Sequence, residues 1–191
     1  MVRDSTDTRT RILDAAVAEF SAFGFAGARI DRIAESAAAN KRSIYVYYEN
    51  KEGLFNAALH RVLSAFVEAV PLTEEDLPGY AGRAFDYLIA QPETVRMSMW
   101  RKLERPAAGP AQGEEYADKI AAMARREPRN ELPPTDLLVL VYGLISAWFT
   151  NPDDLLSADG SDPRSPDRLA IHRAALVEAA ARLVAPANAA G

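Results

Sequence analysis

The chain of 191 residues contains no cysteine. This absence excludes a disulfide framework, a thiolate zinc site and a cysteine nucleophile together, and it fits a reducing compartment. The two histidines leave little room for an imidazole metal cluster. A net charge of −5 also argues against a protein that coats nucleic acid by bulk positive charge.

The sequence also lacks a long hydrophobic run. The longest uncharged apolar stretch covers residues 137–149, which is 13 residues, whereas a membrane span needs roughly 20. The N-terminal residues are polar and have no apolar core of the kind found in a signal peptide. We therefore expect a cytoplasmic protein that has no membrane partner.

Sequence motifs for catalysis are missing as well. There is no glycine-rich phosphate-binding motif, no G-x-S-x-G turn and no H-E-x-x-H pair. The Glu-x-x-His pairs of helical di-iron bundles are absent, since Ala57 precedes His60 and Leu169 precedes His172 by three residues. We therefore expect no catalytic residue, cofactor or metal site, and we do not expect an enzyme.

Proline and charge divide the chain. All 12 prolines lie at or after Pro71, and the net charge is 0 over residues 1–60 and −5 over residues 61–191. Helical periodicity without proline predicts consecutive helices in the first 70 residues, and residues 71–79 break this pattern. Alternating β-type runs are absent, so we expect an all-α fold with later helices near 79–90, 92–105, 113–127, 135–150 and 166–184. The predicted domains are 1–50, a connecting helix 51–70, and 71–191.

Residues 28–51 have the pattern of a helix-turn-helix. A short apolar helix over 30–37 precedes a three-residue turn, Ala38 to Asn40, and a short polar helix over 41–47. The polar helix and its flanks carry cations, hydroxyls and amides that can contact phosphates or base edges. The alternative is a solvated helical face whose tyrosines serve only in packing.

The residues around this pattern favour DNA binding over a solvated helical face, because residues 9–55 resemble the DNA-binding domain of the TetR (AcrR-like) family. The resemblance follows Ile12, Ala15, Ala16, Phe20 and Gly24, then Ile33, Ala34 and Ala37, and then Lys41, Ile44, Tyr45, Tyr47, Tyr48, Lys51, Glu52 and Leu54. It implies DNA contacts at Arg29, Asn40, Lys41, Arg42, Ser43, Tyr45, Tyr47 and Lys51, and core positions at Ile44 and Tyr48. Two departures are Ala28-Arg29, where the family often has Thr, and Ala38-Ala39-Asn40, where it commonly has Gly-Val-Ser.

The resemblance implies an N-terminal three-helix DNA-binding domain, joined by a fourth helix to a C-terminal helical bundle for ligand binding and dimerisation. The apolar helix over 137–149 and the alanine-rich last helix would form a four-helix dimer interface. The alternative is that both helices only close the core of one chain. The predicted interface residues are Leu140, Leu144, Leu169, Leu176, Ala180 and Leu183.

Aromatic residues spread over the later helices suggest a pocket for a small-molecule effector of unknown identity, although core packing is the more common use of any single one of them. The candidates are Phe66, Tyr87, Met97, Trp100, Tyr116, Tyr142 and Trp148. The predicted function is a homodimeric repressor that binds a palindromic double-stranded DNA operator and is released by an effector. The alternatives are an activator, a constitutive DNA-binding regulator, or a helical adaptor or enzyme with a vestigial helix-turn-helix.

Overall fold

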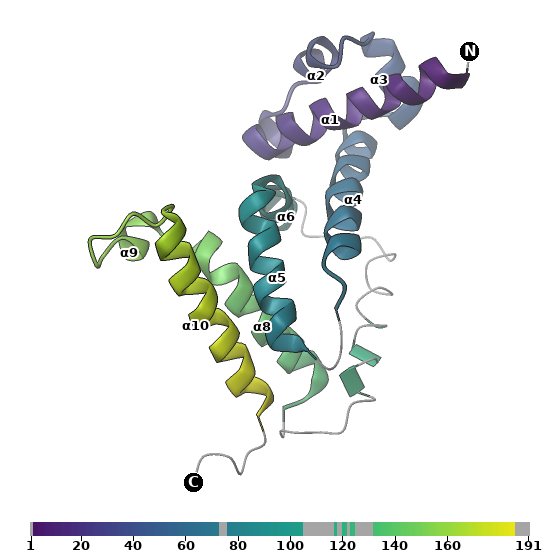
Figure 1. The fold of residues 1–191 in the computed structure, drawn as a ribbon. Helices are drawn as coiled ribbons and strands as arrows, with labels where there is room; N and C mark the ends of the chain where they lie inside the picture. The colour runs from purple at the N-terminus through teal and green to yellow at the C-terminus, as the bar shows by residue number, and fades with distance from the viewer. Residues whose placement is uncertain are drawn as a thin grey trace. The chain divides into compact units, whose positions relative to one another are not determined.

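The computed structural model describes residues 2–72, 76–104 and 132–185, together with residues 117, 120, 121, 123 and 124. All the regular elements in this part of the chain are helices, as predicted. The chain divides into two compact units, of which the first comprises Met1–Ala69 and Gln91–Ala107 and the second Val70–Ala90 and Ala108–Gly191. Figure 1 shows the order of the helices.

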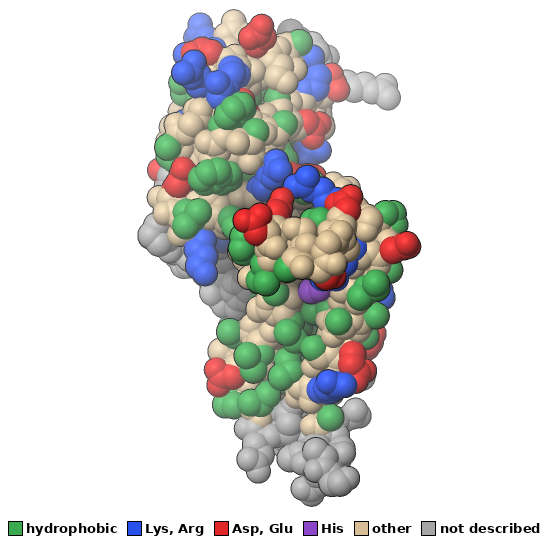
Figure 2. Space-filling model, turned by 90° about the vertical axis from the view of Figure 1, so that its left-hand side faces the viewer, with side chains coloured by type: hydrophobic (Ala, Val, Ile, Leu, Met, Phe, Trp, Pro, Cys, Tyr) green, Lys and Arg blue, Asp and Glu red, His purple; other side chains and the backbone are tan. Residues whose placement is uncertain are grey.

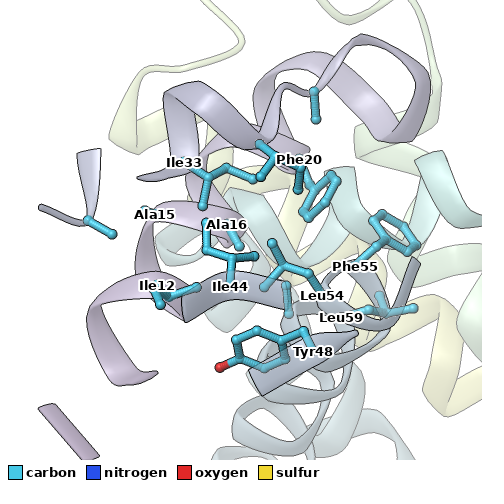
Figure 3. Close-up of a cluster of buried hydrophobic side chains, with 14 of the residues drawn as sticks. Ile12, Ala15, Ala16, Phe20, Ile33, Ile44, Tyr48, Leu54, Phe55 and Leu59 are labelled. Atoms are coloured by element: carbon cyan, nitrogen blue, oxygen red, sulfur yellow. The ribbon is translucent and has the colours of Figure 1, made fainter. Parts of the chain in front are cut away.

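Five of the described helices lie in the first unit: α1 (Val2–Gly27), α2 (Ile30–Ser36), α3 (Lys41–Tyr48), α4 (Lys51–Ala69) and α6 (Pro92–Glu104). α1 packs against α2, α4 and α6, while α3 packs against α2 and α4. Figure 3 shows the apolar side chains of α1 to α4 converging in one core. Burying this shared core is what holds α2 and α3, which are too short to be stable alone, in place.

Local capping signals place α3 and α4 as expected from the sequence. The Asn40 side chain accepts a hydrogen bond from the backbone N–H of Arg42 at 2.8 Å, and the Asn50 side chain accepts one from Gly53 at 2.8 Å. Each amide oxygen satisfies a donor that the first turn of the helix leaves unpaired. A Cβ at Gly53 would overlap the carbonyl oxygen of Tyr48, so the close approach of α3 and α4 requires glycine there.

α1 bends at Gly24, whose backbone angles (φ 69°, ψ −178°) are not helical. The aromatic residues on either side of the bend, Phe23 and Phe25, differ in burial. Phe23 is 50% exposed and lies under the Arg32 guanidinium, with 4.2 Å between the guanidinium carbon and the ring centroid. Phe25 takes its place in the core, with ring centroids 6.3 Å from Phe20 and 5.5 Å from Phe55.

α6 lies within the predicted domain 71–191, and its contacts group it with the first unit. It holds the backbone groups that the bend in α1 releases. The Trp100 indole N–H donates to the Ser21 carbonyl at 3.2 Å, and the Glu104 carboxylate accepts from the Ala26 N–H at 3.0 Å. These contacts explain why a helix of later sequence folds with the N-terminal helices.

The second unit contains α5 (Leu77–Ala90), α8 (Pro134–Thr150), α9 (Asp153–Leu156) and α10 (Pro166–Val184). α5, α8 and α10 pack against one another. Ser165 caps α10, accepting from the Arg168 N–H at 3.3 Å. α9 is a short helix of four residues that follows α8. The helix expected over 113–127 lies mostly outside the described residues.

Candidate nucleic-acid interface

α3 has one buried and one exposed face. Ile44 and Tyr48, four residues apart, are 0% and 6% exposed, which confirms them as core positions. The opposite face carries Arg42, Tyr45 and Val46, all exposed. Because residues three and four apart lie on the same side of a helix, these three side chains form one outward stripe. The buried pair thus fixes which side chains α3 presents to solvent.

Val46 is a member of this stripe that the sequence analysis did not select. Its side chain is 71% exposed, although valine has no polar group to interact with water. The only sequence signal was its place between Tyr45 and Tyr47, one turn after Arg42. Ser43 and Tyr47, which were selected, are only half-buried, and the Tyr47 ring packs 6.3 Å from the Tyr48 ring.

The turn between α2 and α3 contains Ala38 in a left-handed conformation (φ 47°). The Ala38 and Ala39 N–H groups donate to the Glu35 and Ala34 carbonyls at 3.0 and 2.9 Å. The turn therefore forms without the glycine that is common in the family. Its cost is the left-handed backbone, which is unfavourable for a residue with a Cβ.

A buried carboxylate orients the start of α2. Glu19 of α1 is 9% exposed, and its Oε1 accepts from the Arg29 backbone N–H at 2.8 Å and from the Arg32 Nε at 2.7 Å. Arg29, expected to bind DNA through its side chain, precedes α2 and makes no side-chain cap. Glu19 supplies that cap from another helix and places a negative charge where the α2 dipole favours one. Sequence reasoning missed Glu19, because its partners are 10 and 13 residues away.

Lys41 and Lys51 both have partners within the first unit. The Lys41 Nζ lies 2.7 Å from Oδ1 of Asp31 in α2, and this hydrogen bond raises the pKa of the Lys41 ammonium above its usual value. The Lys51 Nζ donates to the Ala26 carbonyl at 3.3 Å and lies 5.0 Å from the Phe25 ring centroid. Lys51 therefore ties α4 to the end of α1, besides being a predicted phosphate contact.

The sequence matches two family models that together cover most of the chain. Residues 12–58 match the model for bacterial regulatory proteins of the tetR family, and residues 76–182 match the tetracyclin repressor-like C-terminal domain. The chain belongs to the TetR family. TetR proteins are DNA-binding transcriptional regulators, so α2 and α3 are the helix-turn-helix of this chain.

Individual relatives agree with the family models. The chain is 40% identical over 150 residues to the transcriptional repressor SCO4008 of Streptomyces coelicolor, covering 74% of this chain and 78% of that one. It is 25% identical over 183 residues to the nicotine-responsive repressor HdnoR of Paenarthrobacter nicotinovorans, covering 85% and 90%. The crystal structure of the transcriptional regulator SCO4942 of Streptomyces coelicolor superposes with a TM-score of 0.79 at 35% identity, covering 92% and 97%.

The residues predicted to line an effector pocket fall in both units of this TetR chain. Met97 is fully buried in the core of the first unit, and Trp100 is bonded to Ser21. Phe66 lies half-buried in α4 of the same unit. The second unit contains Tyr87, Tyr142 and Trp148, and Tyr116 lies outside the described residues. Met97 and Trp100 are thus used in packing α6 against the DNA-binding helices.

The residues predicted for the dimer interface also differ in exposure. Leu176 and Ala180 of α10 are 3% and 0% exposed within a single chain, where α10 packs on α5 and α8. Their side chains are therefore not available to a partner. Leu140 is exposed, and the other three are half-buried: Leu144, Leu169 and Leu183.

None of the described helices combines the length and apolar character that crossing a bilayer requires. No group of three or more side chains suited to hold a metal ion was found among the described residues.

Proposed function

We propose that the protein is a homodimeric repressor that reads its operator with the outward stripe of α3. The observation that carries this proposal is the exposure of Arg42, Tyr45 and Val46 on one side of a helix anchored by Ile44 and Tyr48. A helix presented in this way fits the major groove of B-DNA, which is about 12 Å wide. The names of the relatives SCO4008 and HdnoR support repression.

Each side chain of the stripe suits a different feature of DNA. The Arg42 guanidinium can donate two hydrogen bonds to O6 and N7 of one guanine. The Val46 side chain can contact the methyl group of a thymine without leaving a polar atom unpaired. The Tyr45 hydroxyl can donate to a phosphate oxygen, which positions the helix but carries no sequence information. We therefore expect Arg42 and Val46 to determine base preference.

The test is an unbiased selection of DNA sequences with the wild type, followed by affinity measurements on the selected site. Arg42→Ala should lose about 1–3 kcal/mol on this site and relax the preference at one base pair. The control is Arg96→Ala, which removes an exposed arginine from α6 and should leave base preference unchanged. Equal losses of Arg42→Ala on selected and random DNA would contradict base reading by Arg42.

We propose that a second copy of the chain covers the exposed apolar residues of α8 and α10. Val139 and Leu140 of α8 and Ile171 of α10 are exposed, and Figure 2 shows hydrophobic side chains scattered over the surface of the second unit. A two-fold dimer would match a palindromic operator. The interface uses Leu140, as predicted from the sequence, but not the buried residues of α10.

Light scattering at micromolar concentration tests this assembly. We expect a dimer for the wild type and a monomer for the double variant Leu140→Glu with Ile171→Glu, because charges would be buried without partners. The control is Leu155→Glu, which alters a leucine of α9 that is 60% exposed. A monomeric wild type, or a dimer that survives the double variant, would contradict the proposed interface.

We propose that a small organic effector binds the second unit and releases the operator. The relative HdnoR, whose name describes it as nicotine-responsive, supports a small organic effector. Tyr87, Tyr142 and Trp148 remain the candidate contacts. The chain passes between the units after residues 69, 90 and 107, so both α4 and α6 are covalently continuous with the second unit. Either helix can therefore transmit a change in that unit to the helix-turn-helix.

Two substitutions compare these routes once a library screen has found a compound that weakens operator binding. If α4 transmits the signal, Phe66→Ala reduces the effector-induced change in operator affinity more than it reduces affinity without effector. If α6 transmits the signal, Trp100→Phe reduces the effector-induced change in operator affinity in the same way, because it removes the hydrogen-bond donor to Ser21 and keeps an aromatic ring. Coupling of about 1–3 kcal/mol corresponds to roughly 5- to 150-fold in affinity. A full response in both variants would contradict transmission through these contacts.

A further inference from the structure

We propose that Asp31 competes with DNA phosphate for the Lys41 ammonium and thereby lowers the affinity of the protein for any DNA sequence. This inference rests on the proposed DNA binding by α3. Asp31 is not among the residues predicted to contact DNA. Asp31 would act as an internal substitute for the anion that Lys41 binds in the complex.

The geometry places the competitor at the edge of the proposed interface. Asp31 is the second residue of α2, Lys41 is the first residue of α3, and their charged atoms are 2.7 Å apart. The side chains are 77% and 48% exposed, so the pair lies at the surface beside Arg42. An exposed ion pair contributes little to the free energy of unfolding, so the fold does not depend on this pair. The raised pKa of Lys41 shows that the carboxylate favours the charged ammonium.

Arg42, the other cation at the start of α3, differs from Lys41 in its partners. Among the described residues no carboxylate forms an ion pair with the Arg42 guanidinium, which therefore stays available for a base edge. Lys41, adjacent in sequence, is occupied by Asp31. The arrangement thus neutralises the cation suited to phosphate and leaves free the one suited to guanine. Figure 2 shows the same interspersion of acidic and basic side chains over the first unit.

The expected consequence is a change in salt dependence. A lysine that neutralises a phosphate releases counterions and contributes about −0.9 to the slope of log affinity against log salt. While Asp31 holds the Lys41 ammonium, Lys41 neutralises DNA phosphate less fully and fewer cations leave the DNA, so its contribution in the wild type is smaller. Removing the Asp31 charge should restore the full contribution. Because phosphate contacts carry no sequence information, selected and random DNA should respond alike.

The experiment measures binding of selected and random duplexes from about 30 to 300 mM salt. Asp31→Asn should strengthen binding to both and steepen the slope by up to about 0.9 per protomer, equivalent to about eightfold over this tenfold salt range. Adding Lys41→Ala to Asp31→Asn should abolish the gain, and Lys41→Ala alone should change the slope much less. The matched control is Glu35→Gln, which removes an exposed charge of the same helix that forms no ion pair with Lys41 and should have a smaller effect.

The outcomes separate the possible failures. Equal effects of Asp31→Asn and Glu35→Gln would show general repulsion and overturn the competition. Weaker binding by Asp31→Asn, with an unchanged thermal melt, would show that Asp31 positions Lys41 for DNA instead. If the wild type binds DNA and Asp31→Asn binds it with the same affinity and salt slope, only this inference is overturned. A wild type that binds no DNA would overturn the proposed function, and this inference with it.

Discussion

Substitution of Gly24 tests the bend in α1 and its attachment to α6. The backbone angles of Gly24 lie in a region that is essentially restricted to glycine, where another residue costs about 1–3 kcal/mol. A Cβ there would also lie 3.0 Å from the Trp100 ring and from the Glu104 carboxylate, so both side chains would have to shift. Alanine returns about 0.4–1 kcal/mol by restricting the unfolded chain. We therefore expect Gly24→Ala to lower the free energy of unfolding by about 2 kcal/mol.

Gly27 provides a matched control three residues away on the same helix. Its φ is not left-handed, and a Cβ would meet only the Cβ of Phe23, at 3.4 Å. Gly27→Ala should therefore be neutral or stabilising by up to about 1 kcal/mol. The two alanine substitutions are identical in chemistry and opposite in expected sign.

The assay is urea unfolding followed by circular dichroism and by tryptophan fluorescence in a Trp148→Phe background, in which Trp100 is the remaining tryptophan. Gly24→Ala should shift the fluorescence transition, because Trp100 packs at the bend. Equal effects of the two glycine substitutions, or an unchanged stability of Gly24→Ala, would refute the argument that α1 is bent there.

Three further substitutions have defined expected outcomes. Ala38→Gly should raise the free energy of unfolding by about 0.5–1 kcal/mol in urea, because glycine relieves the left-handed strain; a loss would contradict the observed turn. Glu19→Gln should lower it by about 1.5–3 kcal/mol and weaken operator binding, since α2 loses its anionic cap; unchanged values of both would refute that role. Burial lowers the pKa of His172, so its protonation favours the unfolded chain: wild-type stability should rise with pH from about 5 to 7, and His172→Gln should flatten the rise in pH-dependent melts.

The elements that depend on neighbouring residues could be predicted from the sequence. Asn40 and Asn50 begin α3 and α4 because an amide oxygen satisfies donors two or three residues later. Ile44 and Tyr48 are buried because their four-residue spacing places them on one side of α3. Such signals are contained within a single turn of helix, and they suffice for the outline of the helix-turn-helix.

Contacts between distant residues could not be predicted in the same way. Helical periodicity located α6 almost to the residue, but it did not show that Trp100 and Glu104 would bind α1 about 80 residues earlier. It likewise identified Leu176 and Ala180 as one apolar face without showing that their own chain covers them. Periodicity identifies which face is buried; the partner depends on how the helices pack.

The charged pairs at the candidate interface illustrate the same limit. Lys41 was correctly identified as an exposed cation at the start of α3, but its pairing with Asp31 depends on the geometry of the turn between α2 and α3. Glu19 carried no motif, and only the fold brings it to the start of α2. The sequence predicted α3 as the helix that faces DNA, whereas the partners of the charged side chains could be identified only in the structure.

The absence of cysteine makes possible a direct test of the central claim, that the outward stripe of α3 lies in the major groove. Val46→Cys introduces a single thiol at a 71% exposed position, which can carry an iron-chelate reagent that cleaves nearby DNA. On the selected operator, we predict two clusters of cleavage separated by about 34–36 Å, one helical turn, or a multiple of it. The same reagent on Leu155→Cys of α9, which lies outside the proposed dimer interface, should cleave at background level. Operator binding without cleavage from position 46, or equal cleavage from both positions, would contradict the account.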